Sequence, residues 1–146
     1  MSLNFALKEL DPLDYPQVAE WEFGPQVGVD WARYTFEMSL PKWRHYGLYL
    51  SHQLVGCVSL EKRGTTAIYH VVTARHKLHP NFLAQTLLNI AGHLFENGFA
   101  AVSAHIPIEK RAGARLALRC GMREIGHDQK LRYFILTKSR YLKNGR

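Results

Sequence analysis

The sequence predicts an α/β (α+β) domain, built on one mixed but mostly antiparallel sheet of six or seven strands with helices on both faces. Strand-like and helical segments alternate in the order β, α, α, β, β, β, α, β, α, β, β, without an internal repeat or a low-complexity linker. Residues 81–96 also carry an apolar stripe at helical spacing, typical of an amphipathic helix: Leu83, Leu87, Ile90, Ala91 and Leu94.

The composition is that of an ordinary soluble globular protein. The chain has 146 residues, of which 47% are hydrophobic and 21% charged, so we expect one domain. No apolar run approaches the roughly 20 residues of a membrane span, and the first residues lack the pattern of a signal peptide. Cys57 and Cys120 both lie among apolar neighbours. We therefore expect buried free thiols, a cytoplasmic location and no membrane partner.

The formal net charge of +7 indicates anionic partners. Positive charge is concentrated only at the C-terminal end, at Lys138, Arg140, Lys143 and Arg146. We interpret residues 138–146 as a basic tail that follows a domain of residues 1–137. Two interpretations of this tail stay open: it is simply solvated, or it binds nucleic acid or an acidic surface.

The first elements are a strand at residues 4–10 and helices at 13–20 and 30–38. Asp30 is the expected N-cap of the second helix, because its carboxylate can accept from the unpaired N–H groups of the first turn. That helix carries large or branched side chains at helical spacing: Trp31, Tyr34, Thr35 and Met38. They are expected to pack in the core, or alternatively to line a substrate groove.

The remaining elements follow from apolar runs and the breaks between them. We expect strands at 46–50, 54–60, 65–73, 99–106, 122–127 and 131–137, and helices at 81–96 and 109–120. Residues 61–64 are expected to form a polar turn, and Asn97-Gly98 to end the long helix. A basic loop at 75–80 leads from a strand into that helix. Such a loop suits an anion, because the helix's first N–H groups are unpaired and its dipole is positive there.

Two segments of the sequence resemble the GCN5-related N-acetyltransferase (GNAT) superfamily. Residues 66–95 resemble the segment in which that family's fourth strand leads through a phosphate loop into its third helix. Residues 104–126 resemble the later segment, with Gly121-Met122 at the place of a Gly-Phe pair. This later segment, with Ile106-Pro107 near its start and Arg119-Cys120-Gly121 near its end, is most similar to that of small bacteriophage-encoded GNAT-like proteins.

The resemblance implies a GNAT-like domain that transfers an acyl group from acetyl-CoA to an amine of a small molecule or protein. It places the cofactor along the fourth strand at Val71, Val72 and Thr73, and its phosphates at the start of the helix from Asn81. In the phosphate loop, His79 falls at the Arg/Gln position and Ala84 at the Gly/Ala position. The basic residues Arg75, Lys77 and Lys110 are further candidates for phosphate or pantetheine oxygens.

Two positions differ from the family's pattern. Phe82 stands where a glycine lets the backbone approach the pyrophosphate, and Ala117 stands where a tyrosine protonates the departing thiolate. These differences favour an alternative, a GNAT-fold protein without catalysis. Such a protein would bind a protein partner, for example as a phage virion or head-assembly component, and would then be located in the virion.

Acyl transfer to an amine needs a base and an acid. His70, on the strand at 65–73, can serve as base because imidazole titrates near neutrality; its alternation with Ile68 and Val72 also fits a hydrogen-bonded core histidine. Glu61 is a second candidate base, or an exposed turn charge. Tyr69 and Tyr133 are candidates to replace the missing acid. No metal is predicted, because His76 and His79 supply too few ligands for zinc.

Overall fold

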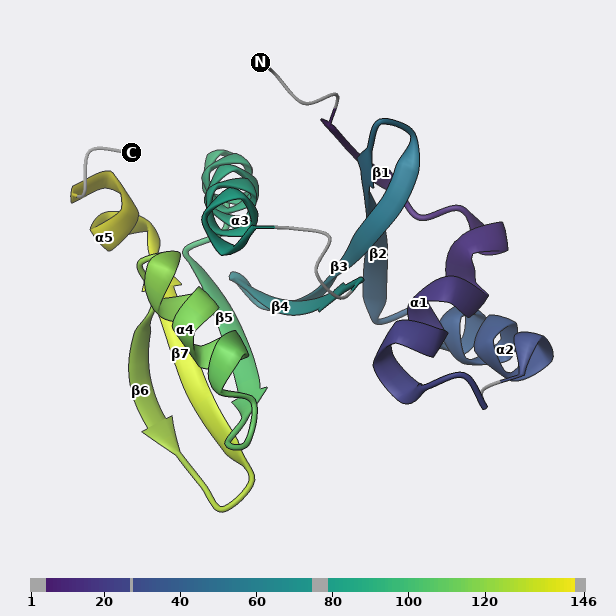
Figure 1. Ribbon diagram of the computed structural model, residues 1–146. Helices are drawn as coiled ribbons and strands as arrows, with labels where there is room; N and C mark the ends of the chain where they lie inside the picture. Colours follow the sequence, from purple (N-terminus) through teal and green to yellow (C-terminus); the bar gives the residue numbers. More distant parts are fainter. Residues whose placement is uncertain (1–4, 27, 75–78, 144–146) are drawn as a thin grey trace. The chain divides into compact units, whose positions relative to one another are not determined.

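The computed structural model describes residues 5–26, 28–74 and 79–143. Its elements, shown in Figure 1, are β1 (Phe5–Glu9), η1 (Pro12–Asp14), α1 (Tyr15–Phe23), α2 (Val29–Ser39), β2 (Trp43–Leu50), β3 (Gln53–Arg63), β4 (Thr66–Thr73), α3 (Pro80–Glu96), β5 (Ala101–Pro107), α4 (Arg111–Arg119), β6 (Arg123–His127), β7 (Leu131–Thr137) and α5 (Lys138–Lys143). The predicted order of strands and helices is confirmed up to β7, and α5 is an addition.

Hydrogen bonds connect the seven strands in the order β1-β2-β3-β4-β5-β7-β6. The pairs β1–β2, β2–β3, β5–β7 and β6–β7 are antiparallel. The pair β4–β5 is parallel, with Thr66 to Tyr69 opposite Ala101 to Ala104. The predicted α/β class and the mixed, mostly antiparallel sheet are therefore confirmed.

The chain forms two compact units. The first, called here the N-terminal unit, comprises Met1–Glu61 and His70–Leu78; the second, the C-terminal unit, comprises Lys62–Tyr69 and His79–Arg146. In the N-terminal unit, α1 and α2 pack against each other, and their side chains Val18, Ala32 and Phe36 belong to one hydrophobic core. The rings of Tyr15 and Phe36 stack with centroids 4.6 Å apart.

Helix α2 buries a different face from the one predicted. Trp31, Tyr34 and Met38 are 48%, 64% and 64% exposed, whereas Ala32 and Phe36 are buried. The buried pair is four residues apart and includes a small side chain, which allows α2 to approach its neighbours closely. The expected packing through the large residues is therefore wrong.

The beginning of α2 also differs from the prediction. Its N-cap is Gly28, which makes no side-chain capping bond, and Asp30 lies within the first turn. There the aspartate carboxylate still interacts favourably with the positive end of the helix dipole. The prediction of Asp30 as N-cap is therefore wrong, although its charge remains at the right end of the helix.

Strand β3 extends through the segment predicted as a polar turn. Trp43 pairs with Glu61 in the β2–β3 register, and the chain turns only at Gly64, where φ is +60°. Glu61 is 3% exposed and lies 3.6 Å from the ammonium of Lys42. The interpretation of Glu61 as an exposed turn charge is thus wrong, because cross-strand pairing continues beyond the last apolar residue.

The C-terminal unit is organised around α3. The predicted apolar stripe is confirmed, since Leu83, Leu87 and Ala91 are buried. Helix α3 ends at Glu96, two residues before Gly98, whose φ of +97° favours glycine. Helix α4 packs on α3, with the Cys120 thiol 3.8 Å from the carbonyl oxygen of Ala84.

Residues 138–143 of the segment interpreted as a basic tail form α5. The Tyr141 ring packs on Phe95 of α3 with centroids 5.2 Å apart. Gly92 leaves room for this contact, because a Cβ there would overlap the Tyr141 hydroxyl. Residues 144–146 lie outside the described residues.

The two thiols agree with the prediction from their apolar neighbours. Cys57 and Cys120 are free and buried, as expected. None of the helices within the described ranges has the length and apolar character needed to cross a membrane.

Candidate functional site

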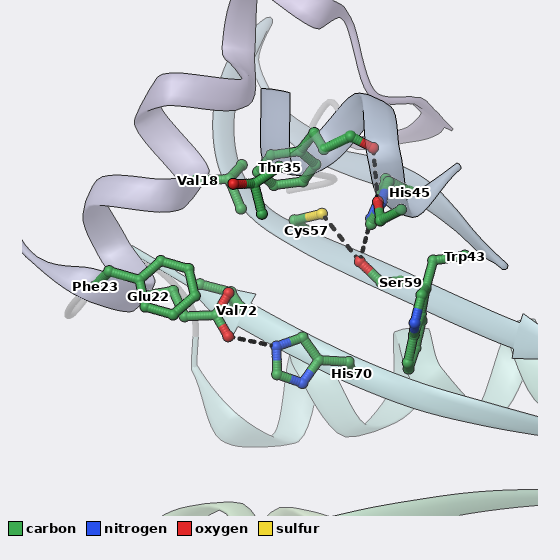
Figure 2. A pocket seen from close by; sticks show the side chains of 12 residues that line it. Val18, Glu22, Phe23, Thr35, Trp43, His45, Cys57, Ser59, His70 and Val72 are labelled. Atoms are coloured by element: carbon green, nitrogen blue, oxygen red, sulfur yellow. Dashed lines mark hydrogen bonds and ion pairs between the residues drawn. The ribbon is translucent and has the colours of Figure 1, made fainter. Parts of the chain in front are cut away.

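The N-terminal unit contains a pocket of about 170 Å³, formed by α1, α2 and strands β2 to β4 (Figure 2). We call it the α1/β4 pocket. Its apolar wall consists of Val18, Phe23, Phe36, Trp43 and Val72. Its polar side chains are Glu22, Thr35, Ser39, His45, Cys57, Ser59 and His70. Of the helix residues predicted to line a groove, Thr35 does so, whereas Trp31, Tyr34 and Met38 do not.

Glu22 and His70 form a carboxylate–imidazole pair at this pocket. The Nε2 atom of His70 lies 2.7 Å from Oε2 of Glu22, and the two side chains point toward each other in Figure 2. A carboxylate only accepts hydrogen bonds, so Nε2 carries a proton, and in the neutral form of the ring the lone pair is then on Nδ1. The His70 side chain is 49% exposed, and its ring meets that of Trp43 edge-on at 6.3 Å. The interpretation of His70 as a core histidine is therefore wrong, and its neutral ring carries the lone pair on Nδ1, as a base requires.

A chain of hydrogen bonds with one direction forms the polar floor of the pocket. Ser39 donates to the carbonyl oxygen of Phe36 at 2.6 Å, so it must accept from His45 Nε2 at 2.7 Å. The neutral His45 ring then accepts at Nδ1 from the Ser59 hydroxyl at 2.6 Å. Ser59 in turn accepts from the Cys57 thiol at 3.7 Å.

The floor is uncharged near neutral pH. Burial, reinforced by the nearby His70, lowers the pKa of His45 to about 4. Burial also raises the pKa of the Cys57 thiol to about 11. Neither group therefore carries charge at pH 7, and the charged groups of the pocket are confined to the Glu22–His70 pair.

The other candidate acids and bases lie away from this pocket. Tyr69 is buried in the C-terminal unit, donates to the carbonyl oxygen of Leu87 at 3.2 Å, and has a pKa raised far above its usual range by burial. Tyr133 donates to Oδ2 of Asp128 at 2.6 Å, and this hydrogen bond raises the pKa of its phenol. Glu61 is not among the lining residues. Within the described ranges, His, Cys, Asp and Glu side chains form no group of three that could hold a metal.

The residues predicted to bind the cofactor lie in both units. Val71, Val72 and Thr73 are half-buried on β4, and Val72 lines the α1/β4 pocket. Ala84 is buried within α3. Lys110 is exposed and is the N-cap of α4, without a side-chain capping bond. Arg75 and Lys77 lie outside the described residues.

The start of α3 offers a guanidinium as well as backbone N–H groups. His79 caps the helix by accepting from the Asn81 N–H at 3.1 Å, and Pro80 has no N–H to offer. Arg119 of α4 donates to Oδ1 of Asn81 at 2.8 Å and so brings a cation to this helix start. The His79 imidazole and the Arg119 guanidinium are chemically suited to the phosphates of a CoA thioester. The helix start offers fewer backbone N–H groups than usual, because Pro80 has none and that of Asn81 is bonded to His79. Sequence reasoning missed Arg119.

Ala117 stands at the position where the GNAT pattern has a tyrosine. Ala117 is 5% exposed, and its carbonyl oxygen accepts from the Met122 N–H at 3.1 Å. An alanine side chain has no proton to donate. The chain therefore supplies no acid from this position of α4.

Most of the pocket's polar residues were not found from the sequence. Glu22 is 48 residues from His70, and no local pattern links them. His45 and Ser59 are direct partners in the β2–β3 register. The predicted hairpin could have paired them, but its first strand was expected to begin one residue after His45.

Seven strands in this order, with these helices between them, define the GNAT fold, and comparison with solved structures agrees. A chimera of the spermidine N-acetyltransferase SpeG from Vibrio cholerae and hSSAT has a TM-score of 0.81 and 17% identity, over 94% of this chain and 98% of that chain. A SpeG point mutant has a TM-score of 0.81 and 15% identity, over 97% and 98%. The Vibrio cholerae enzyme in complex with CoA and spermine has a TM-score of 0.72 and 17% identity, over 94% and 98%. No protein-family model and no curated protein sequence matches the chain.

Proposed function

We propose that the protein is an N-acyltransferase that transfers the acyl group of an acyl-CoA, with acetyl-CoA as the expected donor, to an amine bound in the α1/β4 pocket. The observation that carries this proposal is the Glu22–His70 pair at the α1/β4 pocket. It is supported by the fold, since N-acetyltransferases are among the solved structures similar to this chain and one of them holds CoA.

The residues of the pocket have distinct roles in this proposal. An ammonium must lose a proton before its nitrogen can attack, and Nδ1 of His70 accepts that proton. Glu22 stabilises the imidazolium that results and keeps the ring in one tautomer. The apolar wall of Val18, Phe36 and Val72 excludes water, which favours the neutral amine over the ammonium. Acyl-CoA, when bound, supplies the activated acyl group.

The cofactor assignments rest on the resemblance and on donor chemistry. Val71, Val72 and Thr73 are proposed to hold the pantetheine through the β4 backbone. His79 and Arg119 are proposed to contact the phosphates, together with the predicted residues Arg75, Lys77 and Lys110, whereas Ala84 is buried within α3 and is not assigned to them. No acid is assigned, because the hydroxyls of Tyr69 and Tyr133 already donate to Leu87 and Asp128.

The test is release of the CoA thiol from acetyl-CoA in the presence of a panel of primary amines. We expect amine-dependent release, and we expect His70→Asn to lower kcat about a hundredfold or more, as loss of a general base does. His127→Asn is the matched control, because His127 is exposed on β6 of the C-terminal unit. Amine-independent release only, or full activity of His70→Asn, would overturn the proposal.

A second candidate function is binding or assembly without catalysis, in which a protein partner or a phage assembly replaces the substrate. The shortened row of donors at the start of α3 and the alanine at position 117 favour it. Calorimetry with acetyl-CoA separates the two functions. Absence of binding at millimolar acetyl-CoA excludes the acyltransferase and leaves the binding protein.

A further inference from the structure

We propose that the α1/β4 pocket selects a monoamine: one ammonium on a compact apolar body that ends in a hydrogen-bond donor, such as a hydroxyl. This inference rests on the proposed function and names its acceptor. It separates this chain from the Vibrio cholerae spermidine N-acetyltransferase, one structure of which holds CoA and the polyamine spermine.

The charged end of the pocket has room for one cation. Glu22 uses Oε2 for His70, and Oε1 has no hydrogen-bond partner among the described residues. Of the described side chains that line the pocket, Glu22 alone is acidic. The rings of Trp43 and Phe23 in the same wall add favourable electrostatics for a cation. A second ammonium inside the pocket would lack a carboxylate, and an unpaired buried charge is costly.

The middle of the pocket fits a small apolar group. Val18, Phe36 and Val72 form the wall here, and the cavity of about 170 Å³ is smaller than the roughly 300–1,000 Å³ typical of sites for larger ligands. Burial of such a group contributes about 25 cal/mol for each Å² of apolar surface removed from water. The body of the ligand is therefore about the size of one ring.

The floor accepts hydrogen bonds and does not donate them. In the chain from Cys57 through Ser59 and His45 to Ser39, each side-chain hydrogen is already donated to the next acceptor. Each serine oxygen accepts one bond in this chain and has a second lone pair. The far end of the ligand must therefore be a donor. A carboxylate against these four side chains would face only acceptors; the Thr35 hydroxyl also lines the pocket but is not part of this chain.

The experiment compares four probes by calorimetry on the full chain without acyl-CoA: tyramine, 2-phenylethylamine, 3-(4-hydroxyphenyl)propionate and spermidine. We expect tyramine to bind at least tenfold more tightly than each of the others. Glu22→Gln should weaken tyramine at least tenfold, whereas Glu20→Gln, on an exposed position of the same helix, should not. Ser59→Ala should weaken tyramine but leave 2-phenylethylamine unchanged. If Ser59→Ala does not fold, the four-probe series on the wild-type chain decides alone.

The outcomes distinguish this inference from the proposed function. The monoamine inference is overturned if spermidine binds as tightly as tyramine, if tyramine does not bind, or if Glu22→Gln binds tyramine as tightly as the wild type does. If spermidine nevertheless drives release of CoA, the acyltransferase stands and only its acceptor is wrong. If tyramine binds as expected but no amine drives release of CoA, the acyltransferase is wrong, and the pocket remains a monoamine-binding site.

Discussion

The Nε2 atom of His70 on β4 lies 2.7 Å from Oε2 of Glu22 at the end of α1. Both side chains are partly exposed, 49% for His70 and 27% for Glu22, so the pair is open to solvent and to a ligand. A solvent-exposed pair of a carboxylate and a histidine adds little to stability. Its value to the protein therefore lies in holding the imidazole with its lone pair on Nδ1.

The first prediction concerns the carboxylate of this pair. Glu22→Gln keeps the size of the side chain but removes the charge that stabilises an imidazolium, so kcat for acyl transfer should fall about tenfold to a hundredfold. The Michaelis constant for the amine should rise as well, because the same carboxylate meets the ammonium. Steady-state kinetics with Glu20→Gln as control measures both. Wild-type kcat in Glu22→Gln would show that Glu22 does not position the base.

The second prediction is a pH dependence of stability caused by His45. Its pKa is about 4 in the folded protein and about 6.5 when unfolded, so the folded state disfavours the protonated ring. Its stabilising contribution is complete above pH 6.5 and is lost as the pH falls toward 4. Allowing for partial exposure, we expect a loss of about 2 kcal/mol in the free energy of unfolding.

Urea unfolding at pH 7, 5.5 and 4.5 measures this loss. The variant His45→Gln should be less stable at pH 7, because it disrupts the Ser39–Ser59 connection, but it should lose less stability than wild type on acidification. His127→Asn is the control and should keep the wild-type slope. Equal slopes for His45→Gln and wild type would assign the acid sensitivity to other groups.

The sequence predicted the buried face of a helix correctly where the hydrophobic pattern left only one apolar face. The stripe at Leu83, Leu87 and Ala91 has a single apolar face, and α3 buries that face. Helix α2 has two such faces, and the larger side chains of Trp31 and Tyr34 favoured the wrong one. Sequence periodicity shows that a face is apolar, but the shape of the neighbouring elements decides which face is covered.

The candidate site was much less predictable. His70 was found because a histidine on a central strand is a plain candidate for a base. Glu22 was not found, since it lies on another element and its meeting with His70 depends on tertiary packing. The acceptor-only floor could not be predicted either, because the direction of its bonds follows from the contact of Ser39 with one backbone carbonyl.

The third prediction tests the register of the phosphate loop. Phe82 is the third residue of α3 and stands at a glycine position of the GNAT pattern. If the pyrophosphate lies there, Phe82→Gly should tighten acetyl-CoA binding in calorimetry by removing the bulky side chain. Phe82→Ala is the matched control, because it also removes the bulky side chain but avoids the loss of about 1 kcal/mol of helix stability that glycine causes relative to alanine. A weaker complex with either folded variant would place the phosphates elsewhere.

The last prediction concerns the contact that holds α5 on α3. A Cβ at Gly92 would overlap the Tyr141 hydroxyl and lie 3.1 Å from the ring carbon that bears it. Gly92→Ala should therefore lower the free energy of unfolding by about 1–3 kcal/mol through overpacking. With Tyr141→Ala in the background, the same substitution should instead stabilise the protein by about 1 kcal/mol, because alanine is the better helix former.

Urea unfolding of the four proteins in this double-mutant cycle gives the coupling between the two positions. A change of sign between the two backgrounds requires that Tyr141 rests on Gly92 in solution, and therefore that residues 138–143 are a docked helix. If Gly92→Ala has the same effect in both backgrounds, the Tyr141 ring does not occupy this place. The basic side chains at 138, 140 and 143 would then belong to an undocked segment, as the sequence alone had suggested.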